Sequence, residues 1–430
     1  MRSGLNYGSQ GGDAYCIGHG GAAGHVLGRL GDECDTYVEI ALSQEVYNKA
    51  NNKFTVNTLV AYGTAEGNRD KQGNTWQAVG KGGDRAGPNG DEAWYGQRLS
   101  IREAWAGYEM PSGAQLWAGK RYYQRKDVHI MDWYYLNDSG TGFGVENIGV
   151  GNLGSLAFAL IKQQVDQGDG NDAFPAINSY KLDARWNGIP MWSDASLDIA
   201  MIYAWQNLSR EQKRDFGAHV NQGFMALVEW TQGNFFGGFN KLSFTYGKDG
   251  FQYAGKIKDG NHLGDAVQPY HSRGHGIRLL DWGVIEQPKW NLGYAFMMTH
   301  YHSSHNDGNP HWGSEWIGST GNDYSFVLRP AFKWSDYTST VLEFGFASLN
   351  NHRNENWGGW RNVNGNVNKD RVNGTKLTLA QQWSPSTQFW ARPSIRIFGT
   401  WESGSLMNSA ITGLTKNHQF VYGAQVEAWW

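Results

Sequence analysis

The chain has 430 residues, of which 58 are glycine and 61 are aromatic (21 Trp, 21 Tyr and 19 Phe). Only 18% are charged, and 37 basic against 40 acidic side chains leave a net charge of −3, without the basic excess typical of nucleic-acid-binding proteins. Disorder is also excluded, because a disordered chain carries few aromatic residues.

Hydropathy separates two ways of crossing a membrane. The mean hydropathy is −0.58, and no run of about eighteen apolar residues exists, so the sequence predicts no transmembrane helix. A membrane β-barrel is compatible with this composition, because only every second residue of each strand must face lipid.

Two cysteines, Cys16 and Cys34, stand close together near the start of the chain. A bond between them would close one loop, with a stabilisation of about 3 kcal/mol, and would imply an oxidising compartment. Two unpaired buried thiols are the alternative. Since the chain has no other cysteine, a cysteine-based zinc site is excluded, and no metal or cofactor is expected.

Alternation with period two then recurs to the C-terminus, whereas amphipathic helical periodicity is scarce. Apolar residues occupy alternate positions in 35–42, 196–203, 239–246, 324–334, 388–400 and 419–430. In 388–400 the apolar positions, Phe389 to Ile397, are expected to face outward. Polar stretches such as 63–90 and 350–373 separate the runs. The pattern predicts antiparallel strands of an outer-membrane barrel, joined by long loops and short turns.

A large soluble β-sandwich or propeller would also alternate. Aromatic residues stand at many strand ends, as in the girdles of membrane barrels, and the chain closes on Trp429-Trp430 instead of a polar tail. At about 24 residues per strand and connection, the length gives about 18 strands around an aqueous lumen. No composition break marks a boundary, so we expect residues 1–430 to form a single porin β-barrel domain.

Four runs place one aromatic residue among charged residues on the polar side of the strand, which would face the lumen. These residues are Tyr37, Phe239, Trp390 and Trp429. An aromatic ring can stack on the C–H face of a hexose while neighbouring charges bond its hydroxyls. The arrangement favours a sugar-binding track, with packing of each ring against an inward-folded loop as the alternative.

Six segments, in order along the chain, carry a family resemblance. They are 30–37 (LGDECDTY), 116–129 (LWAGKRYYQRKDVH), 237–241 (GGFNK), 278–283 (RLLDWG), 379–383 (LAQQW) and 425–430 (QVEAWW). The chain resembles the maltoporins, sugar-specific porins of Gram-negative outer membranes. The resemblance implies an 18-stranded antiparallel transmembrane β-barrel with long extracellular loops and a third loop folded into the lumen. It also implies a homotrimer in outer-membrane lipid that passes maltose and maltodextrins by facilitated diffusion.

The resemblance further implies roles for single residues. The family's aromatic slide matches Tyr37, Phe239, Trp390 and Trp429, and Trp76 matches a slide aromatic that a neighbouring subunit's second loop supplies. The polar track and constriction match Arg2, Arg29, Glu39, Arg102, Arg125, His129, Asp132 and Tyr134, with Tyr134 as the steric narrowing. Cys16 and Cys34 match a first-loop disulfide.

One position departs from this pattern, and strand parity argues against another. Asn137 stands where the family usually has Asp, so one hydroxyl acceptor loses its charge, which leaves room for a different sugar preference. Arg102 shares parity with Ala104 and Ala106, so it is expected to face outward if the strand already runs there.

The sequence also leaves room for functions other than transport of maltodextrins. A general diffusion porin, a porin for another oligosaccharide and a soluble carbohydrate-binding protein are the alternatives. Glu39 and Glu427 could be imagined as a glycosidase pair, but nothing in the sequence fixes the separation that such a pair needs. No enzymatic activity is therefore expected.

Overall fold

The computed structural model describes residues 1–9, 26–33, 36–64, 98–165, 177–207, 209–210, 222–251, 274–303, 320–350, 371–407 and 416–429. Eighteen strands form one sheet, and β6 and β7 pair with each other. The sheet strands are β1 (Arg2–Gly8), β2 (Thr36–Lys49), β3 (Asn52–Thr64), β4 (Arg98–Glu109), β5 (Gln115–Arg121), β8 (Gly140–Gly149), β9 (Ser155–Val165), β10 (Ile177–Pro190), β11 (Ala195–Gln206), β12 (Gln222–Phe235), β13 (Gly238–Asp249), β14 (Gly274–Glu286), β15 (Trp290–Ser303), β16 (Thr320–Lys333), β17 (Thr338–Asn350), β18 (Arg371–Trp383), β19 (Ser394–Gly404) and β20 (His418–Glu427). The other elements are β6 (Lys126–Val128), η1 (His129–Met131), β7 (Trp133–Leu136) and η5 (Ser405–Met407).

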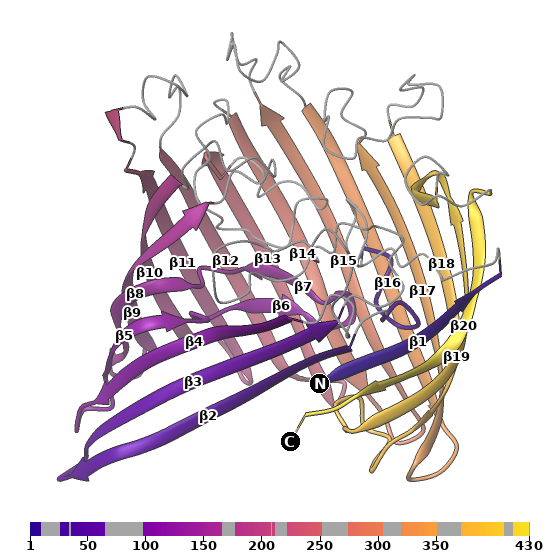
Figure 1. The fold of residues 1–430 in the computed structure, drawn as a ribbon, viewed down its shortest axis with the longest axis horizontal. Coiled ribbons are helices and arrows are strands. Elements are labelled where there is room, and N and C mark those ends of the chain that lie inside the picture. The colour runs from indigo at the N-terminus through magenta and orange to yellow at the C-terminus, as the bar shows by residue number, and fades with distance from the viewer. Residues whose placement is uncertain are drawn as a thin grey trace, which may run out of the picture.

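The sheet closes on itself (Figure 1). Neighbouring strands are antiparallel, β5 pairs with β8, and β1 pairs with β20 from Arg2 to Gly8. On its other side β1 meets β2 at two positions, where Arg2 lies opposite Tyr37 and Ser3 opposite Thr36. This closure confirms the predicted 18-stranded antiparallel barrel.

Several strands are joined by two-residue turns that fit the twist of a hairpin. Ala50 and Asn51 join β2 to β3, and Phe236 and Gly237 join β12 to β13; all four have positive φ. Positive φ at both central residues is the signature of a type I′ turn, which matches the right-handed twist of the strands. Most longer connections, and with them the predicted long loops, lie outside the described residues.

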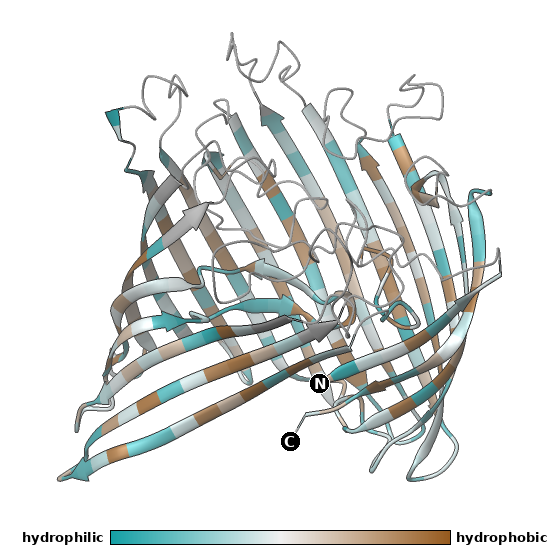
Figure 2. Cartoon of the chain, viewed as in Figure 1, coloured by the Kyte–Doolittle hydropathy of each residue, from teal (hydrophilic) through white to brown (hydrophobic). Residues whose placement is uncertain are grey.

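Apolar and polar residues alternate along the strands (Figure 2), and on many strands the apolar positions are exposed while the polar ones are buried. On β19, Ile395 and Ile397 are exposed, whereas Ser394 and Arg396 are buried. The same parity holds from Tyr324 to Phe332 on β16. An apolar outer face and a polar interior are the arrangement of a barrel that stands in lipid.

No helix in the described ranges is long and apolar enough to cross a bilayer.

A hairpin between β5 and β8 folds into the barrel, as predicted for the third loop (Figure 1). Its apolar side chains are buried in one cluster with residues of the inner wall. The hairpin contributes Val128, Ile130, Met131, Trp133, Tyr135 and Leu136, and the wall contributes Ile202, Met225, Leu280, Trp282 and Met297 among others.

Ionic contacts fix the same hairpin to the wall. Lys126 Nζ lies 2.6 Å from Asp198 Oδ2 and 2.7 Å from Glu229 Oε1. The Tyr135 hydroxyl donates to the second oxygen of Glu229 at 2.5 Å. Because buried charges are tolerated only when they are paired and hydrogen-bonded, these contacts define one position for the hairpin.

Residues 26–33 form a second inward segment, which the sequence did not predict. Leu30 packs against Val341 and Phe398 of the wall. Its backbone N–H donates to Glu343 Oε1 at 2.9 Å, and the Thr378 hydroxyl donates to its carbonyl at 3.1 Å. The lumen is thus narrowed from two sides, by this segment and by the hairpin.

Candidate functional site

Three of the predicted slide aromatics lie in one row. Phe239 on β13 and Trp390, in the turn before β19, have ring centroids 6.3 Å apart and an interplanar angle of 21°. Trp390 and Trp429, just after β20, are 6.5 Å apart. Trp390 and Trp429 are 40% and 44% exposed, so their faces are available to a solute.

The inward hairpin supplies a further ring at this row. The centroid of His129 lies 5.0 Å from that of Trp390 and 5.6 Å from that of Trp429. Phe389 is also buried here and meets Trp390 edge-on at 4.9 Å. The expectation that Phe389 faces outward is wrong, because residues 384–393 form a turn in which strand parity does not apply.

Tyr37 belongs to a different cluster, on β2, which borders β1 on the side away from β20. Arg2 stacks over its ring at 5.4 Å, and its hydroxyl donates to Glu39. The Tyr122 hydroxyl reaches the same oxygen of Glu39 at 3.1 Å. Glu39 therefore offers a carboxylate between two phenols, beside a guanidinium.

Arg102 turns inward because of a β-bulge. Leu59 lies opposite Glu103 and Val60 opposite Ile101, so Arg102 is the extra residue that shifts the register. A bulge switches the side-chain parity of the strand, and Arg102 acts electrostatically on Tyr37 and Tyr122. The expectation of an outward Arg102 is wrong for this reason.

Arg2 of β1 joins the two inward elements through Asp132 and Glu33. An Nη atom of Arg2 donates to Asp132 of the hairpin, and its Nε lies 3.2 Å from Glu33 of segment 26–33. Asp132 ends η1 with φ +46°, a left-handed conformation that Asp tolerates better than most residues. The contacts place alternating charges along the narrowed lumen.

Glu427 is shared by four basic side chains. Its carboxylate lies 2.6 Å from Arg392, 3.3 Å from Arg29, 3.4 Å from Arg396 and 3.5 Å from His129 Nε2. Burial lowers the pKa of His129 to about 3, and the neighbouring arginines act in the same direction, although Glu427 opposes them. His129 is therefore a neutral hydrogen-bonding group at neutral pH.

Arg125 and Tyr134 come together at the predicted constriction. The Arg125 guanidinium carbon lies 3.4 Å from the ring centroid of Tyr122 and 4.5 Å from that of Tyr134. A guanidinium between two rings is held by cation–π contacts. These contacts hold Arg125 and Tyr134 of the hairpin together at the constriction.

Three predicted residues lie outside the described residues, namely Trp76, Cys16 and Cys34. Asn137 is described, and its side-chain oxygen accepts from the Ser139 hydroxyl at 2.6 Å. That oxygen is thus directed at its own turn.

Sequence reasoning did not select Glu33 or Tyr122 as site residues, and it identified Arg392 and Glu427 only as lumen-side charges beside the slide tryptophans. Arg392 and Glu427 each stand two residues from a predicted slide tryptophan, which was the available signal. Arg392 Cζ lies 4.3 Å from the centroid of the Trp429 ring, so the two segments meet directly. Among the described residues no group of three or more His, Cys, Asp or Glu could hold a metal ion.

A closed barrel with an apolar outer face, and a charged lumen that two inward segments narrow beside a row of aromatic rings, defines an outer-membrane porin. The chain matches the model of the LamB porins over residues 1–430, and it belongs to this family. It is 32% identical over 413 residues to a maltoporin of Photobacterium profundum, covering 94% of this chain and 87% of that protein.

The fold is also found among solved structures. Acinetobacter baumannii OccAB1 matches with a TM-score of 0.50 at 11% identity, over 99% of this chain and 94% of that one. The family match and the maltoporin relative identify a β-barrel of the Gram-negative outer membrane. They support a sugar-specific porin as its class, and its family is one of channels, not of enzymes.

Proposed function

We propose that the protein passes maltose and maltodextrins through the outer membrane by facilitated diffusion. The row formed by Phe239, Trp390 and Trp429 carries the proposal. Its rings are spaced 6.3 and 6.5 Å apart and are flanked by His129 and Arg392. Successive sugar rings would stack on the aromatic faces while the polar groups bond their hydroxyls.

Tyr37 and the polar groups would extend this path past the constriction. Glu39 and Asp132 supply acceptors, and Arg2, Arg29, Arg102 and Arg125 supply donors. A solute must bind well enough to enter and weakly enough to leave, so each contact should be shallow and the path should have several sites. Affinity in the millimolar range, about 4 kcal/mol, satisfies both demands.

The remaining features of the assembly are proposals as well. The barrel would work as a homotrimer in outer-membrane lipid, and ions would pass when no sugar is bound. Trp76 would complete the slide of a neighbouring subunit, and Cys16 and Cys34 would be bonded. The trimer, the passage of ions, the role of Trp76 and the Cys16–Cys34 bond are all proposed from family membership.

A porin for another oligosaccharide is the second candidate, and Asn137 favours it. This residue replaces an acidic acceptor, and its oxygen accepts from Ser139. Fewer acceptors at the constriction would change which sugars pass most easily.

Single-channel conductance in planar bilayers tests the proposal, with maltotriose, maltohexaose and sucrose added in turn. Stepwise closure by millimolar maltohexaose, with weaker closure by sucrose, is expected. Insertions that add conductance in groups of three would support the homotrimer.

Two other patterns of current block would contradict the proposal. Current that none of the three sugars reduces would contradict a maltodextrin channel and favour general diffusion. Current that sucrose reduces more strongly than maltohexaose would favour the second candidate.

A further inference from the structure

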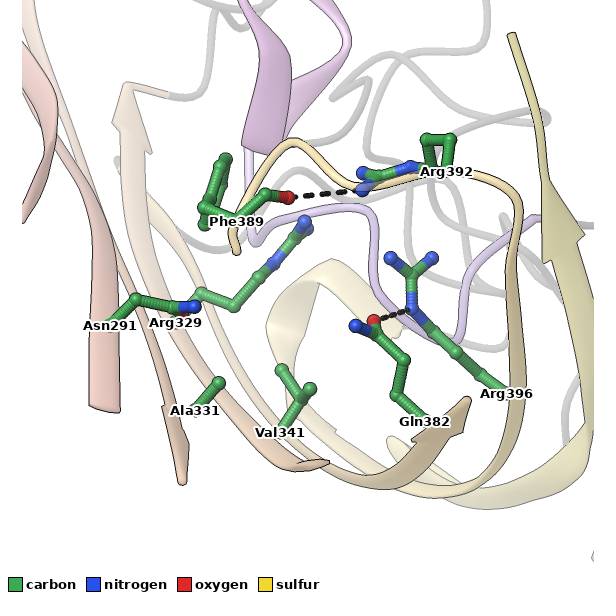
Figure 3. A pocket seen from close by; sticks show the side chains of 8 residues that line it. All are labelled: Asn291, Arg329, Ala331, Val341, Gln382, Phe389, Arg392 and Arg396. Carbon is green, nitrogen blue, oxygen red and sulfur yellow. Dashed lines mark hydrogen bonds between the residues drawn. The ribbon is translucent and has the colours of Figure 1, made fainter. Parts of the chain in front are cut away.

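A small cavity lies under the aromatic row, on the inner wall between β15 and β19. Its volume is about 20 Å³, and it is lined by Asn291, Arg329, Ala331, Val341, Gln382, Phe389, Arg392 and Arg396. Figure 3 shows the guanidinium groups of Arg329, Arg392 and Arg396 pointing toward one region, with Ala331 and Val341 on the apolar side. Three cations thus surround one space.

Two donors of the cavity wall have no acceptor among the described residues. Gln382 uses its oxygen to accept from Arg396 Nε at 2.7 Å, which turns its amide nitrogen away from that bond. In the described part of the chain neither this nitrogen nor Arg396 Nη2 donates a hydrogen bond. Both nitrogens reach solvent-accessible surface, so they can donate to a solute in the cavity. An anion there would accept from both.

Positive charge exceeds negative charge around the cavity. Arg329 and Lys376 share Glu343, with contacts of 2.5 and 3.2 Å. Arg392 and Arg396 share Glu427, which Arg29 and His129 also contact. Five cations therefore share these two carboxylates, and Arg29 has Glu33 as a further partner. Burial lowers the pKa of Arg392, and repulsion from Arg329 and Arg29 adds to this effect.

Size and charge together define the occupant. A space of about 20 Å³ holds an object of roughly the size of a water molecule, so a monatomic anion fits it more easily than a phosphate or carboxylate group. Water would satisfy a donor but would leave the excess positive charge. We propose that one halide ion, chloride in the natural environment, occupies this cavity against Arg329, Arg396 and Gln382.

The ion would also position the slide. Arg392 donates to the Phe389 carbonyl at 3.0 Å and stacks on Trp429 at 4.3 Å. An anion beside it offsets the repulsion from the other guanidinium groups and holds it under the ring. This consequence rests on the proposed sugar function, whereas the ion site itself does not.

Bromide replaces chloride and scatters anomalously, so it is the direct probe. Crystals of the full chain in detergent, grown in sodium bromide, should show one anomalous peak between Arg329, Arg396 and Gln382. A featureless anomalous map at this position, or density that refines as water only, overturns the proposal.

Thermal unfolding in detergent gives a second test in solution. The melting temperature should be higher in chloride or bromide than in methanesulfonate at equal ionic strength, because methanesulfonate does not fit. Ala331→Val fills the cavity and keeps every charge, so it should abolish the difference; Arg396→Gln should do the same. If Arg396→Gln does not fold, Ala331→Val decides.

Arg371→Gln is the matched control. Arg371 lies at the other end of β18, where it donates to Ser348, so the halide difference should persist in this variant. A difference that persists in Ala331→Val overturns the proposal. If bromide binds and maltohexaose never blocks the current, the ion site stands and the proposed function fails.

Discussion

Trp390 and Trp429 lie outside the strands and 39 residues apart in the sequence, yet their ring centroids are only 6.5 Å apart. His129 contacts both rings. The first precedes β19 and the second follows β20. Because β19 and β20 pair from Ser394 to Glu427, the barrel wall itself brings the two rings together. The inward hairpin then adds His129 from the lumen side.

Removing either tryptophan should weaken sugar binding. Trp390→Ala or Trp429→Ala deletes one stacking surface, worth about 1.4 kcal/mol or tenfold in affinity. The half-blocking concentration of maltohexaose in planar bilayers should rise by this factor. Ion conductance without sugar should stay equal or increase, because the lumen becomes wider.

Trp401→Ala is the matched control. Trp401 is 44% exposed, as is Trp429, but it stands on the outer parity of β19. Its loss should leave maltohexaose block unchanged. An equal effect of all three substitutions would mean that the rings act through barrel stability and not by contact with sugar.

The constriction gives a prediction about conductance. Tyr134→Ala should release Arg125, which stacks 4.5 Å from the Tyr134 ring, and should raise the single-channel conductance for potassium chloride. Tyr324→Ala removes a comparable tyrosine, 5.5 Å from Arg371, on the outer face of β16. Conductance that changes equally in both variants, or in neither, would contradict the assignment of Tyr134.

Strand parity could be predicted from the sequence because it depends only on local alternation. Leu197 to Tyr203 and Tyr324 to Phe332 have the predicted faces. Parity failed where the backbone departs from a regular strand. Phe389 lies in a turn and Arg102 in a bulge, and neither departure has a clear local signal.

The ionic contacts of the lumen could not be predicted in the same way. Glu427 meets Arg29 from segment 26–33, His129 from the hairpin and Arg392 from the turn before β19. These residues are far apart in sequence, and closure of the barrel brings them together. Family resemblance selected Arg29 and His129, but only the fold shows that they share one carboxylate.

Glu427→Gln should destabilise the barrel. It leaves Arg392, Arg396 and Arg29 without their shared negative charge, and breaking a buried ion pair costs about 3–5 kcal/mol. The free energy of unfolding, measured with urea in detergent or lipid vesicles, should fall by that amount.

Glu109→Gln removes a carboxylate from an exposed pair, in which Lys53 lies 3.1 Å away. Exposed pairs contribute about 0–1 kcal/mol, so this control should be nearly neutral. Similar losses in the two variants would show that Glu427 is not a special centre of charge.

The protonation of His129 gives a prediction about pH. Its loop does not cross the membrane, and its pKa is about 3 in the folded protein, lowered by burial, against about 6.5 in the unfolded chain. As the pH falls below about 6.5, the unfolded chain takes up a proton that the folded protein refuses, so stability is lost at up to about 1.4 kcal/mol per pH unit. Between pH 7.5 and 5 the wild type should therefore lose more unfolding free energy than His129→Gln, while maltohexaose block stays constant in both. A wild-type step in block centred near pH 6.5 and absent from His129→Gln would show that His129 titrates in the folded channel.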